Sequence, residues 1–237
     1  QEQNSIPGLI TRKLSRKTNK ILLGFKEAEK KLNGNCVFTG NPIMSNLKIY
    51  NKLESKENLG FDTNKKLILI IGGSQGARAI NYYIYENIDF FIKNNYQLYW
   101  QCGYNDIKKL NKIENKSIKI IPFIKDMSKA YSSADLVISR AGAISISELS
   151  IMKKATIFIP LPSAADNHQE LNSKFLSQKK ACVSIHQSNL KNRDLEKTIS
   201  HLFTNDKNLE ELENNIEKFC NKDSNKLIVK EILEEIK

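Results

Sequence analysis

The first segment suited to chemistry is residues 72–78, GGSQGAR, which come directly after an apolar run. Paired glycines let the backbone approach a ligand closely, and a helix that begins after them offers free N–H groups and a partial positive charge to an anion. The Ser74 hydroxyl adds a hydrogen bond for a phosphate. A tight turn without a ligand is the alternative, because the segment matches neither the P-loop nor the G-x-G-x-x-G pattern.

A second segment of this kind is residues 139–148, SRAGAISISE, where a turn of small residues leads into a predicted helix. Ile144 and Glu148 are four residues apart, so they share one face of that helix. The Glu148 carboxylate could accept both hydroxyls of a ribose while backbone amides hold a diphosphate. Without a ligand, Glu148 would only complement the helix dipole and Arg140 would form a structural ion pair.

The third segment is residues 160–169, PLPSAADNHQ, in which two prolines stiffen a loop before a helix. Asp166 is expected to cap that helix. Gln169, at the third helical position, suits either a capping box or the recognition of sugar hydroxyls by its amide. His168 has no neighbour in the sequence that suggests a catalytic triad or a metal site, so it is interpreted as a surface side chain.

These three segments need a framework that brings them together. From residue 66 onward, short apolar runs alternate with amphipathic stretches, which is typical of parallel strands joined by right-handed crossovers. The pattern predicts a doubly wound α/β domain. The expected strands are 67–71, 97–100, 118–121, 136–138, 156–159 and 182–185, and the expected helices include 77–93, 145–153 and 168–179.

Ligands of open α/β sheets bind beyond the carboxyl ends of the strands. All three segments follow such ends, so we expect them to converge on one ligand that combines phosphate, ribose and sugar. The chain has no D-x-D motif to hold a metal-bound diphosphate. We therefore expect neither a metal nor a cofactor, and expect helix dipoles to stabilise a departing nucleoside diphosphate.

The beginning of the chain is expected to be the end of a preceding α/β unit, with a helix over 7–17 and strands over 21–23 and 36–39. Asn41-Pro42 marks a turn, because a residue before proline avoids the helical region. This divides the chain into residues 1–41 and 42–237. Residues 194–237 are charged and carry Leu and Ile at helical spacing.

A net charge of +11 would suit a partner that is a nucleic acid or an anionic membrane. Lysine is spread along the whole chain, and the sequence lacks the clustered arginines and interleaved aromatics typical of nucleic-acid binding. We therefore expect no nucleic acid, but secondary attraction to an anionic membrane. The four cysteines form no C-x-x-C pair, which favours reduced thiols, and no apolar run is long enough to span a bilayer.

The sequence resembles the MurG family of glycosyltransferases. The matching segments appear in order and cover nearly the whole chain. They are Glu2-Gln3-Asn4 with Pro7-Gly8, Thr39-Gly40-Asn41-Pro42, residues 72–78 followed by Asn81, Phe123-Ile124 with Met127, residues 139–148, and residues 166–169.

The resemblance implies a GT-B fold, in which two Rossmann-like domains face each other across a cleft. It also implies inverting transfer of N-acetylglucosamine from UDP-N-acetylglucosamine to the muramyl C4 hydroxyl of undecaprenyl-diphospho-muramoyl-pentapeptide. The product is the lipid-linked disaccharide of peptidoglycan synthesis. A member of this family is expected to act at the cytoplasmic face of the plasma membrane, as a peripheral protein.

The resemblance also assigns roles to residues. Ser74 would contact the diphosphate, together with the backbone amides of Ala143, Ile144 and Ser145. Glu148 would hold the ribose, and the backbone of Ile124 would face uracil. Gln169 and Asn4 would contact the N-acetylglucosamine. Arg140 and Asn81 would support the site.

This chain departs from the family pattern at two places. Met44 stands where the family commonly has an arginine that contacts the donor. The family's N-terminal glycine-rich loop with its histidine, which is expected to carry acceptor binding and the catalytic base, has no counterpart in the sequence. The chain alone is therefore expected to bind UDP-sugar weakly and to turn over little or nothing.

Three other functions remain open from the sequence. The first is another GT-B enzyme, such as a diacylglycerol glycosyltransferase or a UDP-N-acetylglucosamine epimerase. An epimerase needs further acid and base residues, which the sequence does not show. The second is a UDP-binding module without catalysis. The third, a basic nucleic-acid binder, would show strongly salt-dependent binding to DNA.

Overall fold

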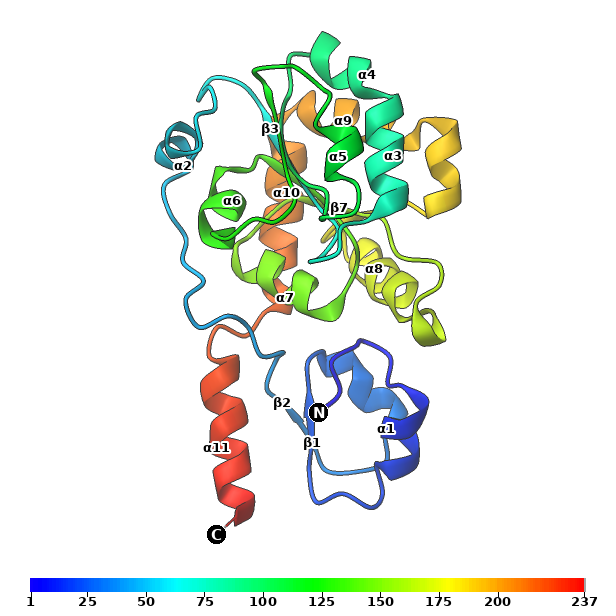
Figure 1. Cartoon of the computed structure of the whole chain (residues 1–237). Coiled ribbons are helices and arrows are strands. Elements are labelled where there is room, and N and C mark those ends of the chain that lie inside the picture. The colour runs from blue at the N-terminus through cyan, green and yellow to red at the C-terminus, as the bar shows by residue number, and fades with distance from the viewer. Residues whose placement is uncertain (237) are drawn as a thin grey trace.

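The computed structural model describes residues 1–236, which form a small N-terminal unit and a larger α/β unit (Figure 1). In the small unit, β1 (Ile21–Leu23) pairs in parallel with β2 (Cys36–Phe38). The helix α1 (Leu9–Leu14) and a 3₁₀ helix, η1 (Lys26–Lys31), complete it. The predicted helix over 7–17 is shorter than expected, because it begins only after Gly8 and ends at Leu14.

The larger unit contains a six-stranded sheet in the order β5-β4-β3-β6-β7-β8, with every neighbouring pair parallel. This confirms the predicted doubly wound α/β fold. The strands are β3 (Leu67–Ile71), β4 (Gln97–Gln101), β5 (Ile118–Ile121), β6 (Leu136–Ser139), β7 (Thr156–Phe158) and β8 (Val183–Ser184).

The central strand β3 is apolar along its length because both faces of the sheet are covered. Ile68 and Ile70 point into one core layer, and Leu67, Leu69 and Ile71 into the other. The first layer contains side chains from α3 (Arg78–Glu86), α4 (Ile88–Lys93), α5 (Ile107–Leu110), α9 (Asp194–Phe203) and α10 (Asp206–Ile216). The second contains side chains from α6 (Met127–Ser133), α7 (Ala143–Ile151) and α8 (His168–Gln178).

The predicted helix over 77–93 is interrupted at Asn87. Its backbone angles of φ −112° and ψ 24° are not helical, and its side-chain amide donates to the carbonyl of Tyr83 at 2.9 Å. An asparagine that bonds to a nearby carbonyl competes with the helical ladder, so the chain forms α3 and α4 in place of one helix.

The strand order creates a crevice at one point of the sheet. From β3 the chain moves outward to β4 and β5, and then returns to form β6 on the other side of β3. The connections after β3 and β6 therefore diverge, and ligands of open α/β sheets bind where this happens, beyond the carboxyl ends. The segments after these two strands are residues 72–78 and 140–142.

The N-terminal unit lies against the larger unit beside α8 (Figure 1). The backbone amide and hydroxyl of Ser5 both donate to Oδ1 of the buried Asn172, at 2.9 and 2.8 Å. Asn172 belongs to α8, so this contact places the first residues of the chain near the carboxyl edge of the sheet.

The last helix, α11 (Ser224–Ile236), leaves the larger unit and runs beside the N-terminal one (Figure 1). Lys20 pairs with Glu231 at 2.7 Å. At the start of α11, Asn225 accepts a hydrogen bond from the amide of Ile43 at 3.2 Å and donates to its carbonyl at 2.9 Å. The division of the chain between residues 41 and 42 stays a prediction. The helix α11 belongs to the predicted second part, residues 42–237, but it packs against residues of the first part, such as Lys20.

One short helix lies between β2 and β3, and three 3₁₀ helices follow later in the chain. The helix α2 (Lys52–Asn58) packs against α6. The 3₁₀ helices are η2 (Ala165–Asn167), η3 (Gln187–Asn192) and η4 (Glu217–Phe219). No helix in residues 1–236 is both long enough and apolar enough to cross a bilayer.

Candidate functional site

A groove of about 410 Å³ lies at the carboxyl ends of β3 and β6. Residues of all three segments identified in the sequence line this groove, because loops that follow parallel strands meet at one edge of the sheet. The lining residues are Gly72, Gly73, Gly76, Ala77 and Arg78 from the first segment and the adjoining Ala79, Arg140, Gly142 and Ser145 from the second, Leu161 and Gln169 from the third, and Gln187 from η3.

The first wall of the groove is a turn that carries Ser74 at its exposed tip. The amide of Gly76 donates to the carbonyl of Gly73 at 3.0 Å and closes the turn. Gly76 has φ +75°, and a Cβ there would lie 2.0 Å from the carbonyl oxygen of Cys102. Only glycine fits both the backbone conformation and the close approach to the end of β4.

The second wall is the N-terminus of α7. Gly142 precedes the helix in an extended conformation, and no described side chain caps it. The amides of Ala143, Ile144 and Ser145 are those of the first helical turn, which lack partners within a helix. Their dipoles and free N–H groups favour an anion at this position.

Arg140 directly follows β6, two residues before Gly142, and is 9% exposed. Its guanidinium donates to the carbonyls of Ile159 and Pro160, at 2.9 and 3.0 Å, and to Oε1 of Gln187 at 2.7 Å. No carboxylate in residues 1–236 forms an ion pair with it, so the structure does not support the alternative interpretation of Arg140 as half of a structural ion pair. Burial lowers the pKa of Arg140 to about 10, which leaves a positive charge at neutral pH beside the groove.

Glu148 lies one helical turn after Ser145 and is half-buried. Its Oε2 accepts a hydrogen bond from the Tyr131 hydroxyl at 2.9 Å. Burial raises the pKa of Glu148 above its ordinary value, and the hydrogen bond from Tyr131 opposes that shift. The carboxylate is thus held in a fixed orientation, with further lone pairs free to accept hydrogen bonds.

The third segment differs from its prediction. Asp166 does not cap α8: it lies within η2 with φ +50°, and the residue before the helix is Asn167 with φ +54°. These two successive residues are left-handed, and α8 begins without a side-chain hydrogen bond from its N-cap residue. Gln169 is the second helical residue, not the third, and its Oε1 accepts from the amide of Leu161 at 3.0 Å.

Asn4 comes from the N-terminal unit and reaches the same edge. Its Oδ1 accepts from Nδ2 of Asn172 at 3.1 Å, and its own Nδ2 donates to Oε1 of Glu2 at 3.3 Å. Asn172 also donates to the carbonyl of Ala141 at 3.5 Å, at the start of the second wall. A single buried amide thus links Asn4 to the loop that follows β6.

Asn81 and Ile124 are both buried. The Asn81 side chain accepts from the indole N–H of Trp100 at 2.9 Å and donates to the carbonyl of Cys102 at 2.7 Å. It therefore supports the end of β4 from inside α3. The amide of Ile124 already donates to the side chain of Gln101 at 2.8 Å, which leaves its carbonyl for a ligand.

The structure thus brings Arg140, Ser145 and Gln169 together in the lining of the groove. Ser74, Ala143 and Ile144 lie next to lining residues along the chain, and Glu148 lies one helical turn after the lining residue Ser145. Asn4, Asn81 and Ile124 are connected to the groove through hydrogen bonds to other residues. Their contacts with a ligand stay predictions.

Sequence reasoning missed Gln101, Tyr131 and Gln187. Tyr131 and Gln187 have no local signal, because each meets its partner only through the fold. Gln101 had one: it is a polar residue that directly follows a predicted strand, the place where the other candidate residues were sought.

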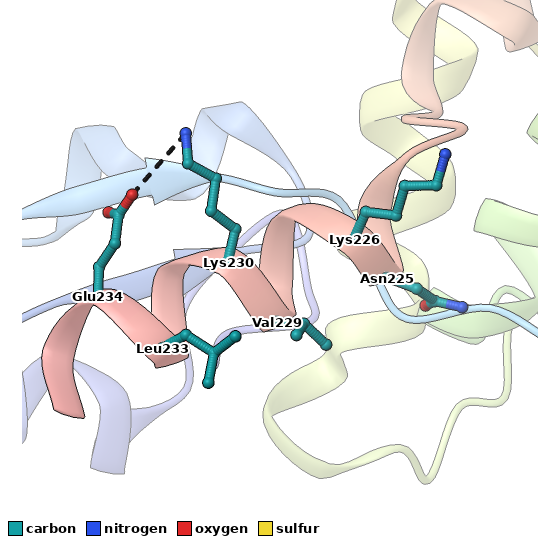
Figure 2. A pocket seen from close by; sticks show the side chains of 6 residues that line it. All are labelled: Asn225, Lys226, Val229, Lys230, Leu233 and Glu234. Carbon is teal, nitrogen blue, oxygen red and sulfur yellow. Dashed lines mark ion pairs between the residues drawn. The ribbon is translucent and has the colours of Figure 1, made fainter. Parts of the chain in front are cut away.

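A larger hollow, of about 690 Å³, lies along α11, where Val229 and Leu233 are exposed (Figure 2). Lys230 and Glu234 form an ion pair at 3.8 Å on the same helix. This hollow is lined by one helix only and lies away from the strand ends, so it offers no convergent polar groups for a small ligand. Nor do three or more side chains of the metal-binding types gather within residues 1–236.

The chain is similar to known proteins over nearly its whole length. It is 38% identical to a protein of Flavobacterium psychrophilum and 34% identical to one of Cytophaga hutchinsonii. Both are named UDP-N-acetylglucosamine--N-acetylmuramyl-(pentapeptide) pyrophosphoryl-undecaprenol N-acetylglucosamine transferase. The matches cover 98% and 99% of this chain, but only 64% of each relative. The chain thus spans somewhat less than two thirds of these relatives.

The fold comparison agrees. The crystal structure of Acinetobacter baumannii MurG matches with a TM-score of 0.78 and 26% sequence identity, over 98% of this chain and 65% of that one. The model of the glycosyltransferase family 28 C-terminal domain matches residues 67–232, which include the whole six-stranded sheet and the groove at its carboxyl edge. The chain therefore belongs to the glycosyltransferase family 28 C-terminal domain family.

Proposed function

We propose that this chain is the donor-binding part of an inverting glycosyltransferase that uses UDP-N-acetylglucosamine. The observation that carries the proposal is the groove in which two glycine-containing turns, the free amides of α7 and the buried charge of Arg140 meet. Amide dipoles and a cation around one cavity suit a diphosphate. The names of the two relatives supply the identity of the sugar nucleotide.

In this proposal the diphosphate lies between the turn that carries Ser74 and the first turn of α7. Negative charge develops on the diphosphate as the bond to the sugar breaks. The α7 amides and the Arg140 guanidinium are fixed before the reaction, so they stabilise that charge without reorganising. Glu148, oriented by Tyr131, would accept hydrogen bonds from the ribose hydroxyls.

The sugar end of the donor would lie toward the third segment and the N-terminal unit. The Gln169 amide nitrogen remains available as a donor, because its oxygen is the atom bonded to Leu161. Asn4 is held toward the same edge by Asn172. These two side chains would contact the N-acetylglucosamine.

The acceptor in this proposal is the lipid-linked muramyl-pentapeptide of peptidoglycan synthesis, whose C4 hydroxyl attacks the anomeric carbon as UDP departs. The attack inverts the configuration at that carbon. We further propose that the protein acts peripherally at the cytoplasmic face of the plasma membrane, where its net charge of +11 favours anionic lipids.

Calorimetry with UDP and UDP-N-acetylglucosamine tests the donor site directly. We expect binding, weakened about tenfold to a hundredfold by Glu148→Ala, because hydrogen bonds to a charged group contribute about 1.5–3 kcal/mol. Glu213→Ala is the control: Glu213 is another half-buried glutamate, whose pKa burial also raises, and it lies on α10 next to Lys154. Failure of the unmodified chain to bind either nucleotide would refute the proposal.

A second assay addresses the acceptor. The purified chain, given the sugar nucleotide and a lipid-linked muramyl acceptor, is expected to form little or no disaccharide, because this proposal gives it mainly the donor side. Ready formation of the product would contradict that division of labour.

A further inference from the structure

Gln101 is the last residue of β4, and its side chain connects two loops that approach the groove from different strands. It is 4% exposed. Its Nε2 donates to the carbonyl of Gly73 at 2.9 Å, and its Oε1 accepts from the amide of Ile124 at 2.8 Å. One side-chain amide thus joins the loop after β3 to the loop after β5.

Each of the two contacts controls a backbone segment with a proposed ligand contact. The Gly73 carbonyl is the one that closes the turn carrying Ser74, through its bond with the amide of Gly76. The Ile124 amide lies in the segment proposed to face the base. A shift of either loop would therefore change the distance between the groups that contact the diphosphate and those that contact the base.

We propose that Gln101 is a positioning residue that fixes the spacing between the base-binding and diphosphate-binding loops. This inference rests on the proposed function. A glutamine suits the role because its amide offers a donor and an acceptor on one rigid plane, whereas a carboxylate could not donate to Gly73. Without this side chain the amide of the buried Ile124 would lose its acceptor. The Gly73 carbonyl would keep only its bond with the amide of Gly76.

The same strand contains a natural control. Gln97 begins β4, is 2% exposed, and makes the same pair of bonds, accepting from the amide of Asp62 and donating to its carbonyl, both at 2.8 Å. The two glutamines thus have the same chemistry, burial and host strand. They differ in place: Gln97 anchors one residue at the amino end of the sheet, and Gln101 joins two loops at the carboxyl end.

The experiment compares Gln101→Met with Gln97→Met in the full chain, by thermal unfolding and by calorimetry with UDP. Each variant removes one bond to a backbone amide and one to a carbonyl that keeps a second donor, Gly76 for Gly73 and Lys65 for Asp62, so both should unfold at a lowered temperature. Only Gln101→Met should weaken UDP binding, by about tenfold, the equivalent of one lost hydrogen bond. Gln97→Met should stay within about twofold of the unmodified chain, since no bond near the groove changes.

The outcomes separate the alternatives. Unchanged UDP affinity in Gln101→Met, or equal losses of affinity in both variants, would overturn the positioning role. If Gln101→Met does not fold, Gln101→Asn replaces it: the amide is retained but one methylene shorter, so it cannot reach both loops, and the same loss is expected. If the unmodified chain itself does not bind UDP, the proposed function fails, and the inference with it.

Discussion

At the amino end of the sheet, Asp135 accepts hydrogen bonds from the ammonium groups of Lys56 and Lys52, at 2.7 and 3.0 Å, and from the amide of Leu67 at 2.8 Å. At the carboxyl end, Arg140 is buried to a similar degree but contacts only neutral oxygens. The charge of Asp135 is thus balanced by opposite charge, whereas that of Arg140 is beside no opposite charge within residues 1–236.

The pKa values of Asp135 and Arg140 reflect this difference. Burial acts to raise the pKa of Asp135, but the hydrogen bonds from Lys56 and Leu67 outweigh it, and the pKa of Asp135 is lowered. For Arg140 burial acts alone and lowers the pKa to about 10. The contacts of Asp135 therefore stabilise the fold, and Arg140 retains a capacity to bind an anion.

The largest effect is expected from a substitution at the amino end of the sheet. Asp135→Ala leaves the buried Lys56 without its partner, which should lower the free energy of unfolding by about 3–5 kcal/mol. Urea unfolding measures it, and Lys52→Ala, which removes a half-exposed partner, should cost less than about 1 kcal/mol. UDP affinity of the folded Asp135→Ala protein should not change. Since the pKa of Asp135 is lowered in the fold, its stabilisation should be lost only as the pH falls below the ordinary range of a carboxylate.

An intermediate effect is expected at the carboxyl end. Arg140→Met keeps an apolar stem of similar length but removes the charge, and should weaken UDP binding by about 1.5–3 kcal/mol, the range for hydrogen bonds to charged groups. Measuring the affinities of both UDP and uridine shows whether the lost charge is the cause. Only UDP has phosphates that the Arg140 charge would attract, so only its affinity should fall. Equal loss for both ligands would mean that the groove had collapsed.

The smallest expected effect concerns pH. Because burial raises the pKa of Glu148, the carboxylate should become protonated at a higher pH than an ordinary glutamate, and UDP affinity should fall with it. Calorimetry between about pH 4 and 7 measures this, since unperturbed glutamates titrate near 4.3. Glu148→Gln should bind more weakly at neutral pH and lose that part of the pH dependence. An identical pH profile in the variant would assign the titration to the ligand alone.

The sheet was largely predictable because its strands are buried on both faces and read as continuous apolar runs, as at Leu67–Ile71. The ends of the helices were less predictable. Asn87 interrupts one predicted helix through a hydrogen bond to Tyr83, and an asparagine within an amphipathic stretch does not reveal this. Asp166 looked like a cap by its position, but its left-handed backbone could not be read from residue type.

The candidate site was predictable at the level of loops, because strand ends that share an edge must meet. Its internal contacts were not. Tyr131 meets Glu148 from another helix, and Gln101 joins Gly73 and Ile124, which are 51 residues apart by their numbers. Such pairs depend on helix orientation and strand register, which the composition of a segment does not determine.

The path of α11 has a consequence for any attempt to cut the protein into its parts. The backbone passes between the two units once after Asn41 and again before Ser224, and Asn225 joins the two passages side by side at Ile43. A protease that cleaves the segment after Asn41 would therefore nick the protein without releasing the N-terminal fragment, which α11 would retain through Lys20 and Glu231. Separation would require a second cleavage near residue 222, or denaturant.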